Sequence, residues 1–236
     1  MADSAWAPSL VSPAPDATNT LRHSAVVRVT HWIATLCFLA LLVTGVEILI
    51  SHPRFYWGET GNVLMPSLFD LPIPASRGAV KTGYGFVLPD QNSWSRSLHF
   101  QTAWVAVFTS LLYAISGLLT GHFSKNLFPA RFKPPGDDEA RSYNTLQRLV
   151  YLVVLFVLFP LMMWTGLAMA PGFTSAFPAT ATVFGGQQSA RTIHFFVTVA
   201  LILFVVVHVV MVWRAGFKNR MRAMITGRVE PHKERS

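Results

Sequence analysis

Charged residues are scarce in this chain of 236 residues: Asp, Glu, Lys and Arg make up 13% of it, against 52% hydrophobic residues. Because soluble domains usually contain about 25% charged residues, the composition excludes an ordinary soluble protein and favours a chain surrounded by lipid. Cysteine is nearly absent, with one in the whole chain. This count excludes an internal disulfide framework and any zinc or iron–sulfur site built from several cysteines.

Long stretches without charge show where the chain can cross a bilayer, since an unpaired charge in the membrane costs about 2.5 to 3.5 kcal/mol. A spanning helix needs about 20 residues. Four intervals of 18, 28, 42 and 22 uncharged residues, the first continued by apolar residues after Glu47, predict helices at about 26–50, 97–122, 146–170 and 192–214. The predicted fold class is therefore an all-α integral membrane protein, with a four-helix transmembrane bundle within residues 23–225.

Basic residues are divided unevenly between the two sides of this predicted bundle. Of the 19 Lys and Arg, 14 lie in the two terminal segments and the second connection, and five lie on the opposite side. The positive-inside rule then places both termini in the cytoplasm. These basic residues flank helix ends and do not cluster on one helix or strand that could enter a groove of DNA. The excess of positive charge therefore gives no support for nucleic-acid binding.

The segments outside the predicted helices differ in character. Residues 1–22 are rich in Pro, Ala, Ser and Thr and lack the apolar region of a signal peptide, which predicts a disordered cytoplasmic tail. Residues 226–236 form a second predicted cytoplasmic tail. The periplasmic connection at 51–96 is long, and loops of this length usually have a function. Its aromatic residues fit either a cap on the bundle end or a contact with a partner protein.

Four of the eight histidines lie inside or at the margin of a predicted helix, where ionisable residues are rare and usually functional. His194 and His208 are 14 residues apart, nearly four whole turns, so they share one face and stand about 21 Å apart along the helix. His31 is level with His208 near the inner surface, and His99 is level with His194 near the outer one. The sequence therefore predicts two histidine pairs, one above the other across the membrane.

Two imidazoles that face each other at one depth match the two axial ligands of a six-coordinate haem iron. We therefore expect the bundle to enclose two b-type haems, one ligated by His31 and His208 and the other by His99 and His194. Zinc is a poorer match, because two imidazoles leave its tetrahedral site incomplete. A c-type haem is excluded because the chain has no Cys-x-x-Cys-His motif. A single histidine at a helix margin is usually an interfacial residue, but four that pair in depth and face favour haem.

Two glycines are placed to leave room for the haems. Gly45 lies 14 residues after His31, at the depth of the outer pair, and Gly117 lies 18 residues after His99, at the depth of the inner pair. Each of these helices therefore offers a ligand to one haem and a residue without a side chain to the other.

Several of these residues also match a known family. The segment Val27–Arg28–Val29–Thr30–His31–Trp32 resembles the Arg-x-x-His-Trp opening of the bacterial di-haem cytochrome b561 family, which includes the cytochrome b subunits of nickel–iron hydrogenase, formate dehydrogenase and thiosulfate reductase. Arg191–Thr192–Ile193–His194, with His208 further on, resembles the two-ligand helix of that family, and His99 matches its second-helix ligand. The resemblance covers nearly the whole chain apart from the tails.

This resemblance implies a membrane subunit in the bacterial inner membrane that moves electrons between a quinone pool and a periplasmic redox partner of the molybdopterin or hydrogenase type. It places the quinone on the cytoplasmic side, where Arg28 and His122 are possible contacts.

Two other functions stay open. Some relatives act as stand-alone superoxide:quinone oxidoreductases. In this chain, basic residues on the outer side could attract the superoxide anion by electrostatic steering. These residues are Arg54, Arg77, Lys81 and Arg96. A transporter without haem would need broken helices near the middle of the membrane, for which only Pro160 gives any sign.

Overall fold

The computed structural model describes residues 23–62, 64–73, 92–121, 123 and 149–227. The predicted tail at 1–22, all but two residues of the tail at 226–236, most of the second connection and His122 lie outside these residues.

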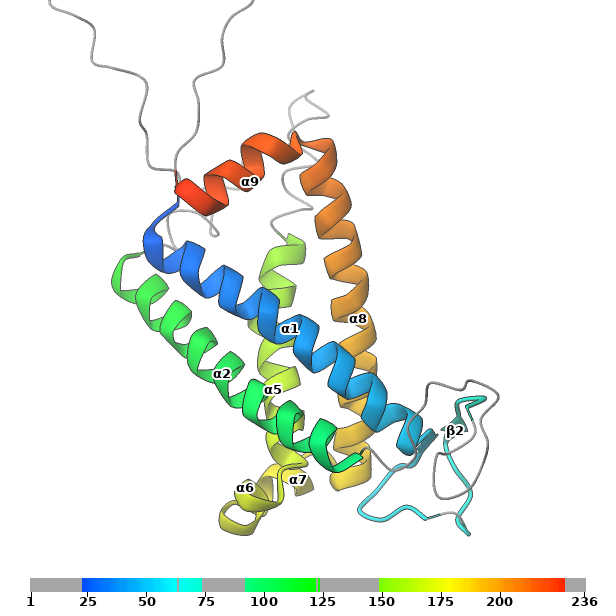
Figure 1. Ribbon diagram of the computed structural model, residues 1–236. Helices are drawn as coiled ribbons and strands as arrows, with labels where there is room; N and C mark the ends of the chain where they lie inside the picture. The colour runs from blue at the N-terminus through cyan, green and yellow to red at the C-terminus, as the bar shows by residue number, and fades with distance from the viewer. Residues whose placement is uncertain (1–22, 63, 74–91, 122, 124–148, 228–236) are drawn as a thin grey trace, which may run out of the picture.

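Four helices are long and apolar enough to cross a membrane (Figure 1). They are α1 (Ala25–Ser51), α2 (Asn92–Leu119), a third helix over Leu149–Ala168 and α8 (Gln187–Arg214). About half of their large apolar side chains are exposed, which suits surfaces that contact lipid. The predicted fold class, an all-α membrane protein with four spanning helices, is confirmed.

Two of these helices begin earlier than the charge pattern suggests. α2 starts at Asn92 and α8 at Gln187, each about five residues before the start predicted from the sequence. The prediction began these helices after Arg96 and Arg191, on the assumption that a charge marks the end of a span. Both arginines lie in the first two turns of their helices. Arg96 is exposed there, so its long side chain can reach water, whereas Arg191 is partly buried and donates to backbone carbonyls of the first connection.

The third spanning helix contains a wider turn. A π-helical segment, η1 (Val154–Leu158), precedes α5 (Phe159–Ala168), and the N–H of Phe159 donates to the carbonyl of Val154. Proline lacks an N–H and its ring clashes with the carbonyl four residues earlier. The π turn thus accommodates Pro160 without breaking the helix.

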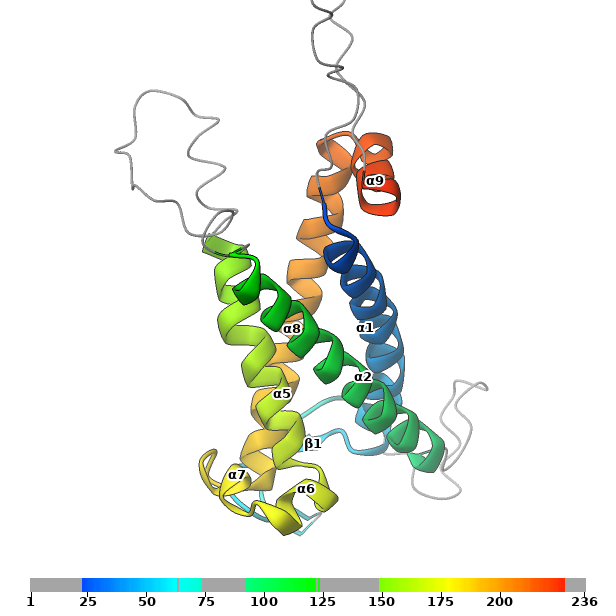
Figure 2. The same cartoon turned by 90° about the vertical axis from the view of Figure 1, so that its left-hand side faces the viewer.

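The helices pack as two pairs, α1 along α2 and α5 along α8, with successive helices running in opposite directions (Figures 1 and 2). A buried cluster of Val154, Val197 and Leu201, contacted by Phe38 of α1, joins the two pairs in the middle of the bundle. We call the two ends of the bundle the α9 end and the hairpin end.

At the α9 end, the short helix α9 (Phe217–Thr226) crosses from the end of α8 to the start of α1 (Figure 1). Gly216, with φ of +94°, makes the sharp turn between α8 and α9. Arg28 Nη1 donates to the Ile225 carbonyl at 2.6 Å, and Trp32 Nε1 donates to the Met224 carbonyl at 3.2 Å. These bonds fix α9 to α1 beside His31. The sequence analysis did not predict α9.

The hairpin end contains the short antiparallel strands β1 (Arg54–Phe55) and β2 (Phe69–Asp70), together with the helices α6 (Pro171–Ala176) and α7 (Ala179–Thr182). Phe55 is 1% exposed, and its ring lies 4.5 Å from that of Phe69 and 4.6 Å from that of Phe195 on α8, between centroids. The first connection therefore packs onto the start of α8.

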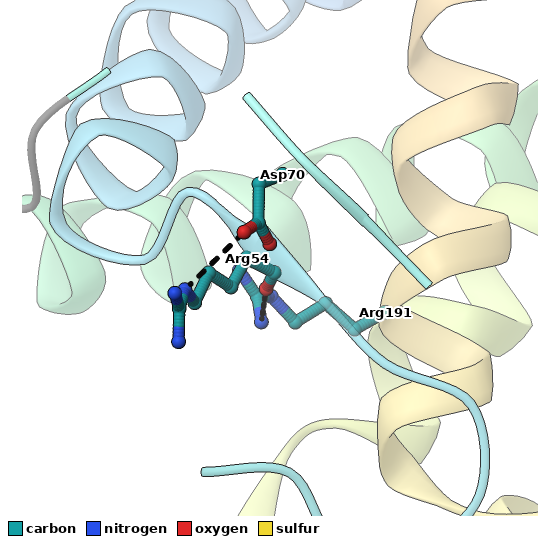
Figure 3. Close-up of polar contacts among 3 residues, drawn as sticks. All are labelled: Arg54, Asp70 and Arg191. Atoms are coloured by element: carbon teal, nitrogen blue, oxygen red, sulfur yellow. Dashed lines mark hydrogen bonds and ion pairs between the residues drawn. The ribbon is translucent and has the colours of Figure 1, made fainter. Parts of the chain in front are cut away.

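Charged groups at this end are also held in place (Figure 3). Arg54 and Asp70 form an ion pair across the two strands at 3.5 Å. The Arg191 guanidinium lies over the Phe55 ring, 4.8 Å from its centroid, and donates to the carbonyl oxygens of His52 and Arg54. Arg191 thus joins the first turns of α8 to the strand β1.

Candidate functional site

The structure brings the four helix histidines together as two pairs, as the sequence predicts. His31 of α1 faces His208 of α8 near the α9 end, with ring centroids 6.4 Å apart and ring planes at 66°. His99 of α2 faces His194 of α8 near the hairpin end, with centroids 6.4 Å apart and planes at 61°. Two sites with the same separation therefore lie at opposite ends of one helix.

This separation matches what one metal ion between two imidazoles requires. A metal bound at Nε2, at about 2.0–2.1 Å, lies roughly 3.2 Å from the ring centroid, so two axial imidazoles have centroids about 6.4 Å apart. Within the described part of the chain, no group of three or more His, Cys, Asp or Glu is placed to hold a metal. Each pair therefore offers two protein ligands, which suits a haem iron, whose other four ligands come from the porphyrin.

Two threonine hydroxyls contact the pair at the hairpin end. Thr44 Oγ1 on α1 lies 2.9 Å from Nδ1 of His99, and Thr165 Oγ1 on α5 lies 2.9 Å from Nδ1 of His194. Thr44 and Thr165 are 1% and 0% exposed. Each histidine of this pair therefore has a buried polar partner from the neighbouring helix, on the nitrogen that would face away from a bound metal.

The pair at the α9 end has a more aromatic setting. The Tyr151 hydroxyl lies 3.2 Å from Nδ1 of His208. The ring of Phe204 stacks on that of His208 with centroids 5.7 Å apart, and the Trp32 ring lies 5.5 Å from that of His31. These contacts orient the two imidazoles mainly by packing.

Glycines lie against both histidines at the hairpin end. A Cβ atom on Gly45 would lie 3.6 Å from Cε1 of His99, and a Cβ atom on Gly166 would lie 3.6 Å from Cε1 of His194. A large side chain at either position would enter the space beside the imidazole. Gly117 contacts Phe123 instead: a Cβ atom there would collide with the Phe123 ring. Its predicted role beside the other pair stays a prediction.

The start of α8 is capped by the first connection, which fixes the position of His194. The Gly58 carbonyl accepts from the N–H groups of Gln188 at 3.0 Å and Ser189 at 3.3 Å, and Glu59 Oε2 accepts from that of Gln187 at 3.3 Å. These N–H groups have no partner within the helix. The first connection thus replaces a side-chain N-cap, which Gly186 cannot provide.

The two predicted quinone contacts have different outcomes. His122 lies outside the described residues. Arg28 donates to the Ile225 carbonyl of α9, and its Nε is buried without a hydrogen-bond partner in the described part of the chain. Arg28 therefore joins α1 to α9, and its contact with a quinone stays a prediction.

Five residues that contact the histidine pairs were not predicted from the sequence: Thr44, Tyr151, Thr165, Gly166 and Phe204. Tyr151 and Thr165 are 14 residues apart, the same interval that separates His194 from His208. The third helix, which offers no ligand, therefore presents one hydroxyl to each histidine of α8. One sequence pattern could have indicated three of these residues. A threonine is followed by a glycine inside an apolar span at 44–45 and again at 165–166.

Comparison with known proteins identifies relatives of the whole bundle. Residues 22–227 match a family model described as prokaryotic cytochrome b561. The chain is also 26% identical, over 222 residues, to a protein of Azospira oryzae with the name "Putative protein-methionine-sulfoxide reductase subunit YedZ1". That alignment covers 87% of this chain and 96% of the relative, so the two proteins are similar over nearly their full lengths.

Proposed function

Because this chain belongs to the prokaryotic cytochrome b561 family, whose members bind haem b and transfer electrons in membranes, we propose that it holds two haems. One would be ligated by His31 and His208, and the other by His99 and His194. The observation that carries this proposal is the equal 6.4 Å separation of the two pairs. Two histidines that met by chance packing would have no reason to be separated by the distance that an iron ion between two imidazoles requires. Chance is a still poorer explanation for two pairs with this separation.

A bound haem supplies one-electron oxidation and reduction at its iron. The chain supplies two imidazoles per site, holds them apart at the right distance and surrounds them with apolar helices. Along α8 the two ligands are 14 residues apart, about 21 Å, so the sites together extend over most of the roughly 30 Å hydrocarbon layer. This arrangement suits electron transfer from one membrane face to the other.

We further propose that the protein lies in the bacterial inner membrane, with the α9 end in the cytoplasm and the hairpin end in the periplasm. The family works with quinone and redox partner subunits. Quinone would react at the α9 end, and a periplasmic oxidoreductase of the molybdopterin or hydrogenase type would contact the hairpin end. The name of the Azospira relative, which describes a reductase subunit, supports a partner subunit here too.

The first experiment is to purify the protein and measure its haem content and its reduced α band. We expect two b haems per chain, with an α band that is split or broadened. Replacing His99 by Ala should remove the haem at the hairpin end and spare the other, whereas His31→Ala should do the reverse. One haem in the wild type, or equal loss of both haems in either variant, would contradict the proposed pairing.

A stand-alone superoxide:quinone oxidoreductase is the alternative function. One of the basic residues proposed to attract superoxide, Arg54, is paired with Asp70, which reduces the charge available for steering. The assay that separates the two functions is quinone reduction by superoxide with purified protein alone. Rapid reduction without a partner subunit would favour the alternative.

A further inference from the structure

The two threonines at the hairpin end share one hydrogen-bond pattern. Thr44 Oγ1 donates to the Ala40 carbonyl, 2.7 Å away, four residues earlier in α1. Thr165 Oγ1 donates to the Leu161 carbonyl, 2.8 Å away, four residues earlier in its own helix. A hydroxyl has a single proton. Once that proton is given to the helix backbone, the hydroxyl can only accept from a histidine.

This restriction fixes the protonation of the facing imidazoles. Nδ1 of His99 and of His194 each lie 2.9 Å from a hydroxyl that can only accept, so each Nδ1 carries the proton. In a neutral imidazole the other nitrogen, Nε2, then has a free lone pair. Both histidines are therefore prepared to bind a metal through Nε2 before any haem arrives.

The two ends of the bundle differ in this respect. His208 has the Tyr151 hydroxyl at the longer distance of 3.2 Å, and a phenol hydroxyl can either donate or accept. For His31, the structure records ring contacts with Trp32 and His208 in the described residues but no hydrogen bond from its ring there. The pair at the hairpin end thus has two hydroxyls that act as fixed acceptors, and among the described residues no such hydroxyl is recorded for the other pair.

We propose that Thr44 and Thr165 are positioning residues that hold His99 and His194 in the Nδ1–H form and thereby lower the reduction potential of the haem at the hairpin end. A ligand histidine that donates from its second nitrogen becomes more basic. A more basic ligand favours the ferric over the ferrous iron, because it stabilises the higher positive charge. This inference rests on the proposed haem ligation. It adds that two threonines set the reduction potential of the haem at the hairpin end.

The test is a redox titration of purified protein in which Thr44 or Thr165 is replaced by Val, which removes the hydroxyl and keeps the branched shape. We expect the potential of the haem at the hairpin end to rise, with a three- to tenfold change in its ferrous-to-ferric ratio at fixed potential, about 30–60 mV for one electron. The other haem should keep its potential. The Thr→Ser variants, which retain a hydroxyl, should restore the wild-type value.

A matched control is Thr109→Val on α2. Thr109 is 8% exposed and donates to the Val105 carbonyl at 2.7 Å, and no histidine contact of its hydroxyl is recorded in the described residues. We expect this variant to leave both potentials unchanged.

Each outcome decides between the possibilities. If the Val variants keep both haems and both potentials, or if Thr109→Val raises the same potential, the inference is wrong. If a Val variant loses the haem at the hairpin end and the Ser variant keeps it, the hydroxyl holds the histidine in its ligating form, which supports the positioning role, and the potential of the Ser variant then tests the effect on the haem. If both the Val and the Ser variants lose that haem, packing and not the hydroxyl is responsible, and the inference is wrong. A wild-type protein without haem at this end contradicts the proposed function itself.

Discussion

Replacing Gly186 by Ala tests whether the first connection holds α8 in place. Gly186 has φ of +120°, and a Cβ atom there would lie 2.5 Å from the backbone of Gly58 and Glu59. With ψ of 172° as well, Gly186 lies in a region of backbone conformation that is almost restricted to glycine and costs an L-residue about 1–3 kcal/mol. If the connection moves away, the Gly58 carbonyl also loses two N–H donors from α8, at about 0.5–1.5 kcal/mol each. The expected loss of unfolding free energy is thus about 2–6 kcal/mol.

For a chain of this size, such a loss lowers the melting temperature by about 4–24 °C, which thermal unfolding in detergent measures. Because His194 lies seven residues after Gln187, we also expect the haem at the hairpin end to be lost before the other on heating. Gly185→Ala is the control. Gly185 has φ of +79°, but a Cβ atom there would meet only Ser189 Oγ, at 3.7 Å. Equal destabilisation by the two substitutions would refute the reasoning, because the contact with Gly58 would then contribute nothing.

Three further predictions follow from the site and its surroundings. Gly45→Leu should prevent haem binding at the hairpin end while haem absorbance from the other end remains, because the side chain would enter the space beside His99; unchanged haem content would contradict this. Ring planes at 61° and 66° should give strongly anisotropic low-spin ferric signals in electron paramagnetic resonance, and spectra typical of parallel imidazoles would be inconsistent with the structure. Phe55→Ala should cost about 3–5 kcal/mol of unfolding free energy, since Phe55 is 1% exposed, whereas Trp57→Ala, at a residue that is 60% exposed, should change stability little.

The spanning helices and the pairing of the histidines could be predicted from the sequence because both depend on regular geometry. Charge-free stretches mark helices that cross lipid, and a 14-residue interval on a helix returns to the same face. Where the helices begin was less predictable. Arg96 and Arg191 lie inside helices, because the long side chain of Arg96 is exposed and that of Arg191 donates to the carbonyl oxygens of His52 and Arg54. The nearest charge therefore does not mark a helix end.

The residues that contact the histidines from neighbouring helices could not be predicted in the same way. Thr44 is 55 residues from His99, and Thr165 is 29 residues from His194. No periodicity within one helix relates such positions, because the contact depends on how two helices are rotated against each other. The π turn at Val154–Leu158 adds to this difficulty, since it changes the face that Tyr151 presents relative to Thr165.

The long first connection had two interpretations, a cap on the bundle end or a contact with a partner protein. Its described residues act as a cap: Gly58 and Glu59 accept from the first N–H groups of α8, and Phe55 packs against that helix. This role explains why a protein whose paired histidines all lie on helices needs an ordered hairpin. Gly186 provides no side-chain N-cap for α8, so without the contacts of Gly58 and Glu59 the first N–H groups would lose their partners and the helix start would fray. Because His194 lies two turns inside that start, these contacts also help to hold it opposite His99.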